Sequence, residues 1–404
     1  MNNVTDCKTG RSCTGCSMCA VVCPKKAISI NLSQDGFYLP ILDADKCVNC
    51  GLCQKVCYKF DLSYQKSSNG NLPVCFSAVN KNNSELLSSS SGGVSIELMK
   101  QCLRMGYYVV GVAYDSTDNI AKTKIAMNES ELEPFKGSKY FQSDTLDAFS
   151  NVIKDKTEQK YAIFGTPCQI YAFSKAAELQ KSRDKYILVD IFCHGCPSLN
   201  LWKKYLEYSK EKYGESEFDE IKFRSKTHGW HEFCFDFKKQ SKQYSSSKYS
   251  DPFYELFFSM DAMNEACYDC VARSSIEKAD IRLGDFWGKR FDLDIKGVSA
   301  VVTQTGLGQR LFEAVKDKFY CQPMNFDEII AAQSYGKPHS VKTDDRLQTL
   351  SLLSSNLSMT NIIKKHRKLL PAKIKVKNLL KNGLKHLPTG IYNTLKSVIH
   401  KTGD

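Results

Sequence analysis

No part of this 404-residue sequence offers the ~20 consecutive apolar residues that a helix needs to cross a bilayer. Its opening residues, MNNVTDCKTG, also lack the basic and apolar segments and the small-residue cleavage site of a secretory signal. A Gly-x-Gly-x-x-Gly sequence is missing as well, which excludes the usual dinucleotide-binding turn. We therefore expect a cytoplasmic protein whose cysteine thiols stay reduced.

Net positive charge is scarce outside the C-terminus. The net charge is +12, but residues 360–404 alone hold ten lysines and one arginine against one aspartate. A nucleic-acid-binding surface needs Lys and Arg spread over a folded face, with aromatic residues for stacking. The sequence therefore gives no indication of a nucleic-acid partner.

The pattern of apolar residues divides the chain into four parts. A cysteine-rich head covers residues 1–62, a polar segment typical of a linker covers 63–73, a main body covers 74–340, and a lysine-rich tail covers 341–404. In the body, strand-like runs alternate with helical patterns, which predicts an α+β or mixed α/β fold. The strand-like runs are 107–114, 160–165, 185–193 and 297–304, and the helical patterns lie near 94–105, 145–156, 168–180, 198–213 and 307–318.

Cysteine is the residue that this sequence has in excess, since nine of its 18 cysteines lie in the first 57 residues. Eight of them form two quartets with the spacing Cys-x2-Cys-x2-Cys-x3-Cys, and Pro24 follows the first quartet. Bacterial ferredoxins have this run, in which the fourth cysteine binds the other cluster. The spacing therefore predicts a ferredoxin-like head with two [4Fe-4S] clusters, one held by Cys13, Cys16, Cys19 and Cys57, and the other by Cys23, Cys47, Cys50 and Cys53.

Zinc is the alternative metal for these thiols. A zinc site takes four ligands in two pairs, so it gives no reason for eight cysteines in a doubled register. Cys7 lies outside both quartets, and we expect it to be a bystander.

Eight segments of the body follow one another over about 210 residues: SSSSGGV (88–94), KGSKYFQS (136–143), FGTPCQI (164–170), DIFCHGCPS (190–198), FRSKTHGW (223–230), CYDC (267–270), DIRLGDFWG (280–288) and KGVSAVV (296–302). Together they resemble the beta-subunit family of coenzyme F-420 (deazaflavin) hydrogenases and dehydrogenases, which includes 7-hydroxymethyl chlorophyll a reductase. The resemblance implies FAD and at least one further cluster in the body. A flavin suits a chain of clusters because it converts single electrons into two-electron chemistry.

Two short segments are the candidate flavin-binding sequences. The first precedes a helical pattern, where free backbone N–H groups bind phosphate, and the second adds charge and a ring. Read alone, they are a flexible linker and a solvated loop. The candidate residues are Ser90, Ser91, Gly92, Gly93, Lys136, Ser138, Lys139 and Tyr140, with Thr166 in the FGTPCQI segment.

The further body cluster has four candidate ligands within the matched segments: Cys168, Cys193, Cys267 and Cys270. A zinc site or buried, apolar thiols are the alternatives, because cysteines this far apart in sequence prove no common site. Cys196 forms an alternative ligand pair with Cys193.

An acidic-aromatic loop of Asp285, Phe286 and Trp287 resembles the flavin-proximal segment of the family, although packing explains its aromatic rings equally well. His194, His228 and His231 are candidate catalytic proton donors near neutral pH. A lone histidine is more often structural.

The tail combines lysines with an apolar stripe, which predicts an amphipathic helix. It would bind an anionic surface at the inner face of a membrane, or pack against the body or a partner. Stand-alone relatives with a fused ferredoxin head are often associated with bacterial surface-polysaccharide synthesis, which implies a lipid-linked substrate nearby. The stripe is Val376, Leu380, Leu384, Leu387, Ile391, Leu395 and Val398.

Together these features predict a flavin- and cluster-dependent oxidoreductase that takes electrons from ferredoxin or another low-potential donor and reduces a bound small molecule or lipid-linked substrate. One alternative is a non-catalytic electron-transfer subunit of a hydrogenase- or formate-dehydrogenase-like complex that exchanges electrons with deazaflavin. Another is a cluster-bearing assembly factor for glycan synthesis.

Overall fold

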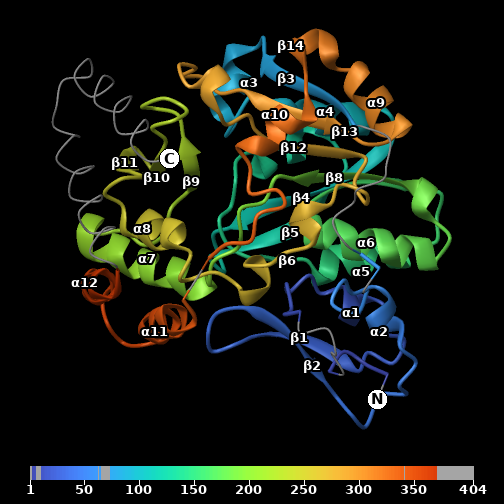
Figure 1. The fold of residues 1–404 in the computed structure, drawn as a ribbon, viewed down its shortest axis with the longest axis horizontal. Helices are drawn as coiled ribbons and strands as arrows, with labels where there is room; N and C mark the ends of the chain where they lie inside the picture. The colour runs from blue at the N-terminus through green and yellow to red at the C-terminus, as the bar shows by residue number, and fades with distance from the viewer. Residues whose placement is uncertain (1, 6–10, 62, 65–72, 341, 371–404) are drawn as a thin grey trace.

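A nine-stranded mixed sheet forms the centre of the body, with strand order β14-β3-β13-β12-β8-β7-β4-β5-β6 (Figure 1). The computed structural model describes residues 2–5, 11–61, 63–64, 73–340 and 342–370. The predicted mixed α/β class is confirmed. The strands of this sheet are β3 (Val74–Asn80), β4 (Tyr107–Asp115), β5 (Ile120–Ala126), β6 (Ser143–Asp144), β7 (Lys160–Phe164), β8 (Tyr186–Ile191), β12 (Ile281–Asp285), β13 (Ser299–Thr303) and β14 (Phe319–Met324).

Four adjacent strands in the middle of the sheet, β4, β7, β8 and β12, run parallel. Their carboxyl ends therefore meet at one edge, which is where open α/β sheets bind ligands. β7 ends at Phe164, β8 at Ile191 and β12 at Asp285. The segments that carry Cys168 and Cys193 and the acidic-aromatic loop all leave the sheet at this edge.

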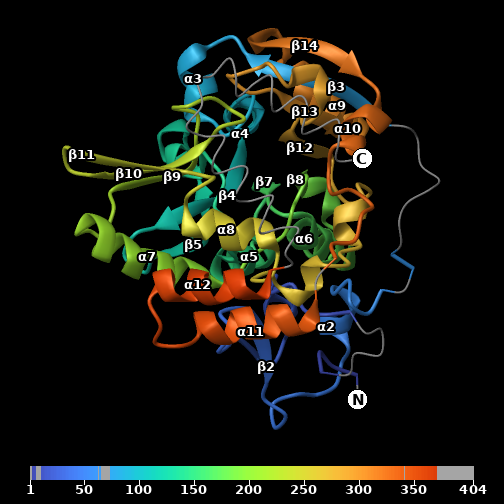
Figure 2. The same ribbon diagram turned by 60° about the vertical axis from the view of Figure 1, so that its left-hand side comes forward.

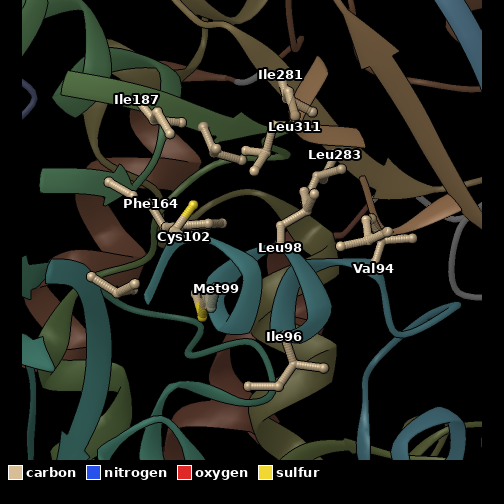
Figure 3. Close-up of a cluster of buried hydrophobic side chains, with 14 of the residues drawn as sticks. Val94, Ile96, Leu98, Met99, Cys102, Phe164, Ile187, Ile281, Leu283 and Leu311 are labelled. Atoms are coloured by element: carbon tan, nitrogen blue, oxygen red, sulfur yellow. The ribbon is translucent and has the colours of Figure 1, made fainter. Parts of the chain in front are cut away.

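Helices cover both faces of the sheet. One face carries α4 (Val94–Arg104) and α9 (Gly306–Glu313), and the other carries α5 (Leu146–Lys154) and α6 (Pro167–Leu179). Figure 3 shows Leu98 and Cys102 of α4 facing Leu283 and Phe164 of the strands. The short helices α3 (Asn83–Ser88) and α10 (Phe326–Ala331) lie near the β3 and β14 end of the sheet (Figure 1).

A second, aromatic-rich layer lies beside the large sheet. It consists of the antiparallel strands β9 (Glu220–Ser225), β10 (Cys234–Lys239) and β11 (Lys242–Ser247), with α7 (Leu199–Tyr213) and α8 (Pro252–Ser259). The rings of Trp202, Phe223 and Phe235 meet in its core, where Trp202 is fully buried. Burial of such rings is a large source of stability, so this layer has a core of its own.

The head is a small unit of the antiparallel hairpin β1 (Ile28–Leu32) and β2 (Tyr38–Leu42) with two short helices, α1 (Met18–Val21) and α2 (Leu52–Lys55). It lies below α5 and α6 in Figure 1. Met18 and Val21 of α1 pack into the same buried cluster as Phe149 of α5 and Tyr171 of α6. The head is therefore joined to the body by a shared apolar core.

After residue 341 the chain forms α11 (Thr343–Leu353) and α12 (Met359–Leu369), which pack beside α7 and α8 (Figure 2). Ile362 and Ile363 of α12 are buried in the aromatic core. The apolar stripe predicted for the tail, from Val376 to Val398, lies outside the described residues, as do Cys7 and most of the predicted linker. In the described part of the chain, every helix falls short of the length and apolar character that a membrane span requires.

The predicted elements of the body are confirmed, with one difference at residues 307–318. There α9 ends at Glu313, and Lys316–Lys318 form a separate 3-10 turn. Val315 leaves the helical conformation with φ −123° and is fully buried against the sheet. The helix therefore ends just before Val315, at the point where this β-branched side chain enters the core.

Candidate metal and cofactor sites

Each of two cavities in the head is lined by four thiols. Three cysteines of one quartet and the last cysteine of the other contribute to each cavity, which is the grouping expected from the spacing. We call them the inner cavity, lined by Cys13, Cys16, Cys19 and Cys57, and the outer cavity, lined by Cys23, Cys47, Cys50 and Cys53. Among the described residues, no three His, Cys, Asp or Glu side chains meet as closely as a single metal ion requires.

The same backbone geometry shapes both cysteine loops. In the first loop, Gly15 and Ser17 flank Cys16 with φ of 71° and 62°. In the second, Asn49 and Gly51 flank Cys50 with φ of 52° and 75°. Left-handed residues on both sides of the middle cysteine turn the chain around the cavity, and glycine takes this conformation without steric cost.

The donor set fits an iron–sulfur cluster. Burial raises the pKa of Cys16 to about 11, and burial together with the charges of neighbouring cysteines raises the pKa of Cys19. Thiolates crowded in this way need a positive centre between them, and the iron of a cluster binds the thiolate form. The eight head cysteines therefore have the chemistry to hold two cubane clusters, which would supply one-electron carriers.

The inner cavity faces the body. The Thr145 hydroxyl donates a hydrogen bond to the Cys16 carbonyl at 3.0 Å. The Gln142 side chain donates to the Thr14 carbonyl at 3.0 Å and accepts from the Tyr38 N–H at 2.8 Å. These bonds hold the first cysteine loop against the large sheet. By contrast, Cys50 of the outer cavity is exposed.

Segments at the carboxyl ends of β7 and β8 carry two of the candidate thiols of the body. Cys168 lies in the first turn of α6, where Thr166 and Gln169 form a capping box and Pro167 occupies the start of the helix. Cys193 follows β8 by two residues. Both positions are fixed by regular structure, so these thiols are held on a rigid base.

The structure brings these two thiols close to the remaining body candidates. Burial raises the pKa of Cys267, and the charges of Cys193 and Cys270 raise it further. Cys168 is affected in the same way by Cys270, Cys193 and Cys16. Because the interaction between two charges weakens with distance, the four candidate cysteines lie in one neighbourhood, and Cys168 and Cys270 pack on the same apolar cluster as Cys16 of the inner cavity.

Cys196 belongs to the same neighbourhood. After burial, the charges that raise its pKa come from Cys267, Cys193 and Cys168. Its carbonyl accepts a hydrogen bond from the Asn264 N–H at 2.8 Å, which ties it to the segment that carries Cys267. The body therefore gathers five thiols rather than four. We call them the body thiols: Cys168, Cys193, Cys196, Cys267 and Cys270.

A buried charged group lies at the carboxyl end of β12. Asp285 forms an ion pair with Arg224 of β9, and its other oxygen accepts a hydrogen bond from the Trp230 indole at 2.8 Å. The Trp230 and Trp287 rings stack with centroids 4.8 Å apart and planes 7° from parallel. Arg224 Cζ lies 5.2 Å from the centre of the Trp287 ring. We call Arg224, Asp285, Trp230 and Trp287 the arginine cluster.

The two segments predicted to bind flavin lie beside each other. The Ser138 N–H donates to the Ser90 hydroxyl at 3.1 Å. The Ser91 hydroxyl donates to the Val298 carbonyl at 2.8 Å, so it is already bonded within the protein. Of the serines in the first segment, Ser90 is therefore the one that faces the second segment.

The two glycines of the first segment have structural reasons for their positions. At Gly92, an added Cβ would lie 2.1 Å from the Ala78 carbonyl, and the Gly92 N–H already donates to the Ser299 hydroxyl at 2.9 Å. Gly93 directly precedes α4 with φ 78°, a conformation that favours glycine. Close packing on the sheet and entry into the helix therefore account for both residues.

The lysines of this region already have partners. Lys136 pairs with Glu85 and Glu133. The Lys139 ammonium donates to three backbone carbonyls within residues 134–137, and burial lowers its pKa to about 7. Their charge is therefore used within the protein.

Arg224 and Lys226 were not among the site residues predicted from the sequence. The Lys226 ammonium donates to the carbonyls of Leu86, Ser91 and Lys296, and burial lowers its pKa to about 7. Both residues lie in the segment FRSKTHGW, so the signal was present as two basic residues separated by a single serine at the end of a strand.

Tyr140 and Phe286 have surroundings that explain them as packing residues. The Tyr140 ring lies 4.8 Å from that of Phe257. Phe286 is 1% exposed and contacts Phe291 edge to face at 4.9 Å. Trp287 is more accessible, and it is the ring of the acidic-aromatic loop that belongs to the arginine cluster.

The first candidate catalytic histidine, His194, lies at the body thiols, directly after Cys193. Its Nδ1 lies 3.2 Å from the Ser334 hydroxyl, and its ring lies 5.8 Å from that of Phe257. The His194 side chain is exposed, and partial desolvation by its neighbours lowers its pKa below the usual 6.5, with the charge of His339 adding to this effect. His194 is therefore neutral near pH 7.

The other two candidate histidines lie elsewhere. His231 lies at the arginine cluster, with Nε2 3.0 Å from the Phe291 carbonyl and its ring 5.6 Å from that of Trp287. His228 is exposed on the turn that follows β9. The three histidines therefore do not converge, and each candidate redox site of the body has at most one of them.

Two family models match the chain. One, described as the C terminus of the beta subunit of coenzyme F420 hydrogenase/dehydrogenase, matches residues 158–328, and the other, a 4Fe-4S dicluster domain, matches residues 12–59. Among solved structures, a chain of the F420-reducing [NiFe] hydrogenase complex from Methanosarcina barkeri is 18% identical, with a TM-score of 0.44. The match covers 74% of this chain and 91% of that chain. No curated protein matches the chain.

The first matched range contains all five body thiols and the arginine cluster, and the second contains all eight quartet cysteines. The resemblance inferred from the sequence is therefore confirmed. This chain is therefore an iron–sulfur electron-transfer protein that is related, through residues 158–328, to the beta subunits of coenzyme F420 hydrogenase/dehydrogenase and that matches a 4Fe-4S dicluster domain at residues 12–59.

Proposed function

We propose that this protein is an FAD-dependent iron–sulfur oxidoreductase, with electrons entering at the outer cavity and passing through the inner cavity to the body thiols. The observation that carries this proposal is the order of the three thiol groups. Cys50 of the outer cavity is exposed, whereas Cys16 of the inner cavity packs on the same apolar cluster as Cys168 and Cys270 of the body. An external donor such as ferredoxin would therefore reach the outer cluster first.

The body thiols have a short connection to the arginine cluster. His194, beside the body thiols, lies 5.8 Å from the Phe257 ring, which lies 4.8 Å from the Tyr140 ring. Arg224 and Asp285 both influence the pKa of Tyr140, which burial raises. A flavin near these residues would be close to the last cluster and would supply the conversion from one-electron to two-electron chemistry.

Four parts of the chain would hold the flavin under this proposal. The Ser90 and Ser138 hydroxyls come from neighbouring loops, and Trp287 offers a ring surface. Arg224 has buried donors with no acceptor among the described residues, as a bound polar group would require. His231, beside Trp287, is the histidine placed to exchange a proton with a substrate there.

Anaerobic purification followed by analysis of iron, sulfide and flavin tests the proposal. We expect one flavin and about twelve irons, whereas about eight irons would restrict the clusters to the head. Reduced ferredoxin should then reduce the flavin, and Cys53→Ala and Cys57→Ala should each slow this at least tenfold. Cys321→Ala, outside the thiol groups, is the matched control. Protein with clusters but no flavin would contradict the proposal.

A second candidate function is electron exchange with deazaflavin as the subunit of a larger complex. The family description of residues 158–328 favours it. The dithionite-reduced protein, freed of dithionite, should then bleach the absorbance of coenzyme F420. Failure to do so while the bound flavin is reoxidised by another acceptor would exclude this candidate.

A further inference from the structure

Two buried arginines of this protein differ in how their guanidinium groups are used. Arg282 donates from Nε to one oxygen of Asp190 at 2.7 Å and from Nη2 to the other at 2.5 Å. This is the side-on, two-pronged bond that arginine forms with carboxylates and phosphates. In Arg282, the side of the guanidinium that carries Nε and Nη2 is therefore fully hydrogen-bonded, and we call this side the Nε–Nη2 edge.

Arg224 has the same edge without a bonded acceptor. Its Nη1 pairs with Asp285, but Nε and Nη2 are buried and have no hydrogen-bond partner among the described residues. The Tyr140 hydroxyl approaches the guanidinium closely enough for a side-chain interaction with Arg224 to lower the pKa of Tyr140, but its geometry falls short of a hydrogen bond from Nε or Nη2. The Arg224 side chain is only 4% exposed. Buried donors of a charged group are nearly always paired in native proteins, so this edge calls for an acceptor beyond those that the described part of the chain provides.

The surroundings favour an acceptor with negative charge. The two oxygens of Asp285 already accept, one from Arg224 and one from Trp230. Lys226, two residues along the chain, is a second basic group near Asp285, and Asp294, which also acts on Lys226, accepts from two backbone N–H groups. The nearby carboxylates are thus already bonded elsewhere. Since charged donors form their strongest hydrogen bonds with anions, the edge of Arg224 suits an anionic ligand.

The position also suits a ligand. Asp285 is the last residue of β12, one of the four parallel strands whose carboxyl ends meet at one edge of the sheet. The Trp287 ring lies beside the guanidinium, with its centre 5.2 Å from Cζ. A planar group bound at this edge would have both an aromatic neighbour and a charged partner.

We propose that Arg224 is an anion receptor whose Nε–Nη2 edge binds two side-by-side acceptors carrying negative charge. The pyrimidine end of a reduced flavin and the carboxylate or phosphate of a substrate share this chemistry. Binding of a flavin at this edge rests on the proposed function, whereas binding of a substrate anion does not. Arg224 is thus a binding residue at the carboxyl edge of the sheet.

Four proteins test this receptor: the wild type, Arg224→Gln, Arg224→Lys and Arg290→Gln. The glutamine variant removes the charge, and the lysine variant keeps a cation near Asp285 but removes the two-pronged edge. Arg290 lies on the surface, 49% exposed, so its replacement controls for net charge. Iron content and melting temperature show which variants are folded, and the lysine variant keeps the test valid if the glutamine variant is not.

The first arm measures the midpoint potential of the bound flavin by spectroelectrochemistry. If Arg224 holds the reduced ring, both Arg224 variants should bind reduced flavin, relative to oxidised flavin, at least tenfold less tightly than the wild type. For a two-electron couple, this is a fall of about 30 mV or more in potential. Arg290→Gln should leave the potential unchanged.

The second arm uses protein without flavin and measures the rise in melting temperature with inorganic phosphate and with acetate. A rise in the wild type and in Arg290→Gln that is lost in both Arg224 variants would assign the edge to a substrate-type anion. If neither the potential nor the anion response differs between the Arg224 variants and Arg290→Gln, the receptor is overturned. Absence of bound flavin would reject the proposed function, and the second arm would then decide the receptor alone.

Discussion

The Thr145 hydroxyl donates a hydrogen bond to the Cys16 carbonyl at 3.0 Å, and this bond joins the residue before α5 to the middle cysteine of the inner cavity. Thr145 is fully buried, so the bond is shielded from water. It fixes the inner cavity relative to the large sheet, and hence relative to the body thiols.

Replacement of Thr145 by valine should loosen this junction. Valine keeps the shape but leaves the buried Cys16 carbonyl without its donor, which should cost about 1–3 kcal/mol. We expect a lower midpoint for thermal loss of the visible cluster absorbance, with an unchanged iron content at low temperature. Thr117→Val, at an exposed turn, is the control. Equal midpoints for both variants would show that the bond contributes nothing to the junction.

The grouping of the thiols predicts which cysteine variants resemble each other. Cys13→Ala and Cys57→Ala change the inner cavity, although the two residues belong to different quartets. Both should lose the same electron paramagnetic resonance signal and about four irons. Cys23→Ala and Cys53→Ala should lose the other signal, because these residues line the outer cavity. Pairing by quartet instead of by cavity would contradict the crossed arrangement.

Asp251 predicts a pH-dependent contribution to stability. Burial raises its pKa from 3.8 to about 6, against the hydrogen bond from Tyr205. The folded protein therefore keeps a proton on Asp251 that the unfolded chain releases near pH 4. The free energy of unfolding should therefore fall as the pH rises from about 4 to about 6, and above pH 6 it should stay lower by about 3 kcal/mol at most.

The Asp251→Asn variant removes this titration and keeps an oxygen that can accept from the Phe253 N–H. Its melting temperature relative to the wild type should therefore rise between about pH 4.5 and pH 7. Asp292→Asn, at an exposed site, should show no such trend. A constant difference between Asp251→Asn and the wild type across this range would refute the assignment.

Removal of residues 371–404 tests the predicted membrane role of the tail. The deleted segment holds seven lysines and one aspartate, and each lysine near an anionic surface contributes roughly 1 kcal/mol. The full chain should float with phosphatidylglycerol vesicles at low salt and not with phosphatidylcholine vesicles, whereas the shortened chain should float with neither. Iron content should be unchanged, since α12 ends at Leu369. Equal flotation of both chains would dismiss membrane binding by the tail.

Regular spacing made the head predictable. The cysteines of each quartet have a fixed spacing. From this spacing it follows that Cys23 lines the cavity of the second quartet and Cys57 that of the first. The strands of the parallel centre were predictable too, because β7 and β8 are continuous apolar runs, as expected for strands covered on both faces.

The body site was less predictable because it depends on tertiary contacts. Lys136 and Lys139 look like free charges in the sequence, and only the fold shows their partners, which are carboxylates for Lys136 and backbone carbonyls for Lys139. The open edge of Arg224 is visible only once the surrounding acceptors are placed. Proximity of Cys196 to Cys267 likewise follows from a loop contact that no spacing rule describes.

The body binds the head at a second place besides the first cysteine loop, namely the tip of the β1–β2 hairpin. The Gln34 carbonyl accepts hydrogen bonds from Asn200 of α7 at 2.8 Å and from Ser354, just after α11, at 3.0 Å. Because the head is bonded to the body at two places, we expect it not to move as a rigid unit between an electron-accepting and an electron-donating position. Transfer from head to body should therefore depend on tunnelling distance, and its rate should be the same in buffer and in viscous glycerol solutions.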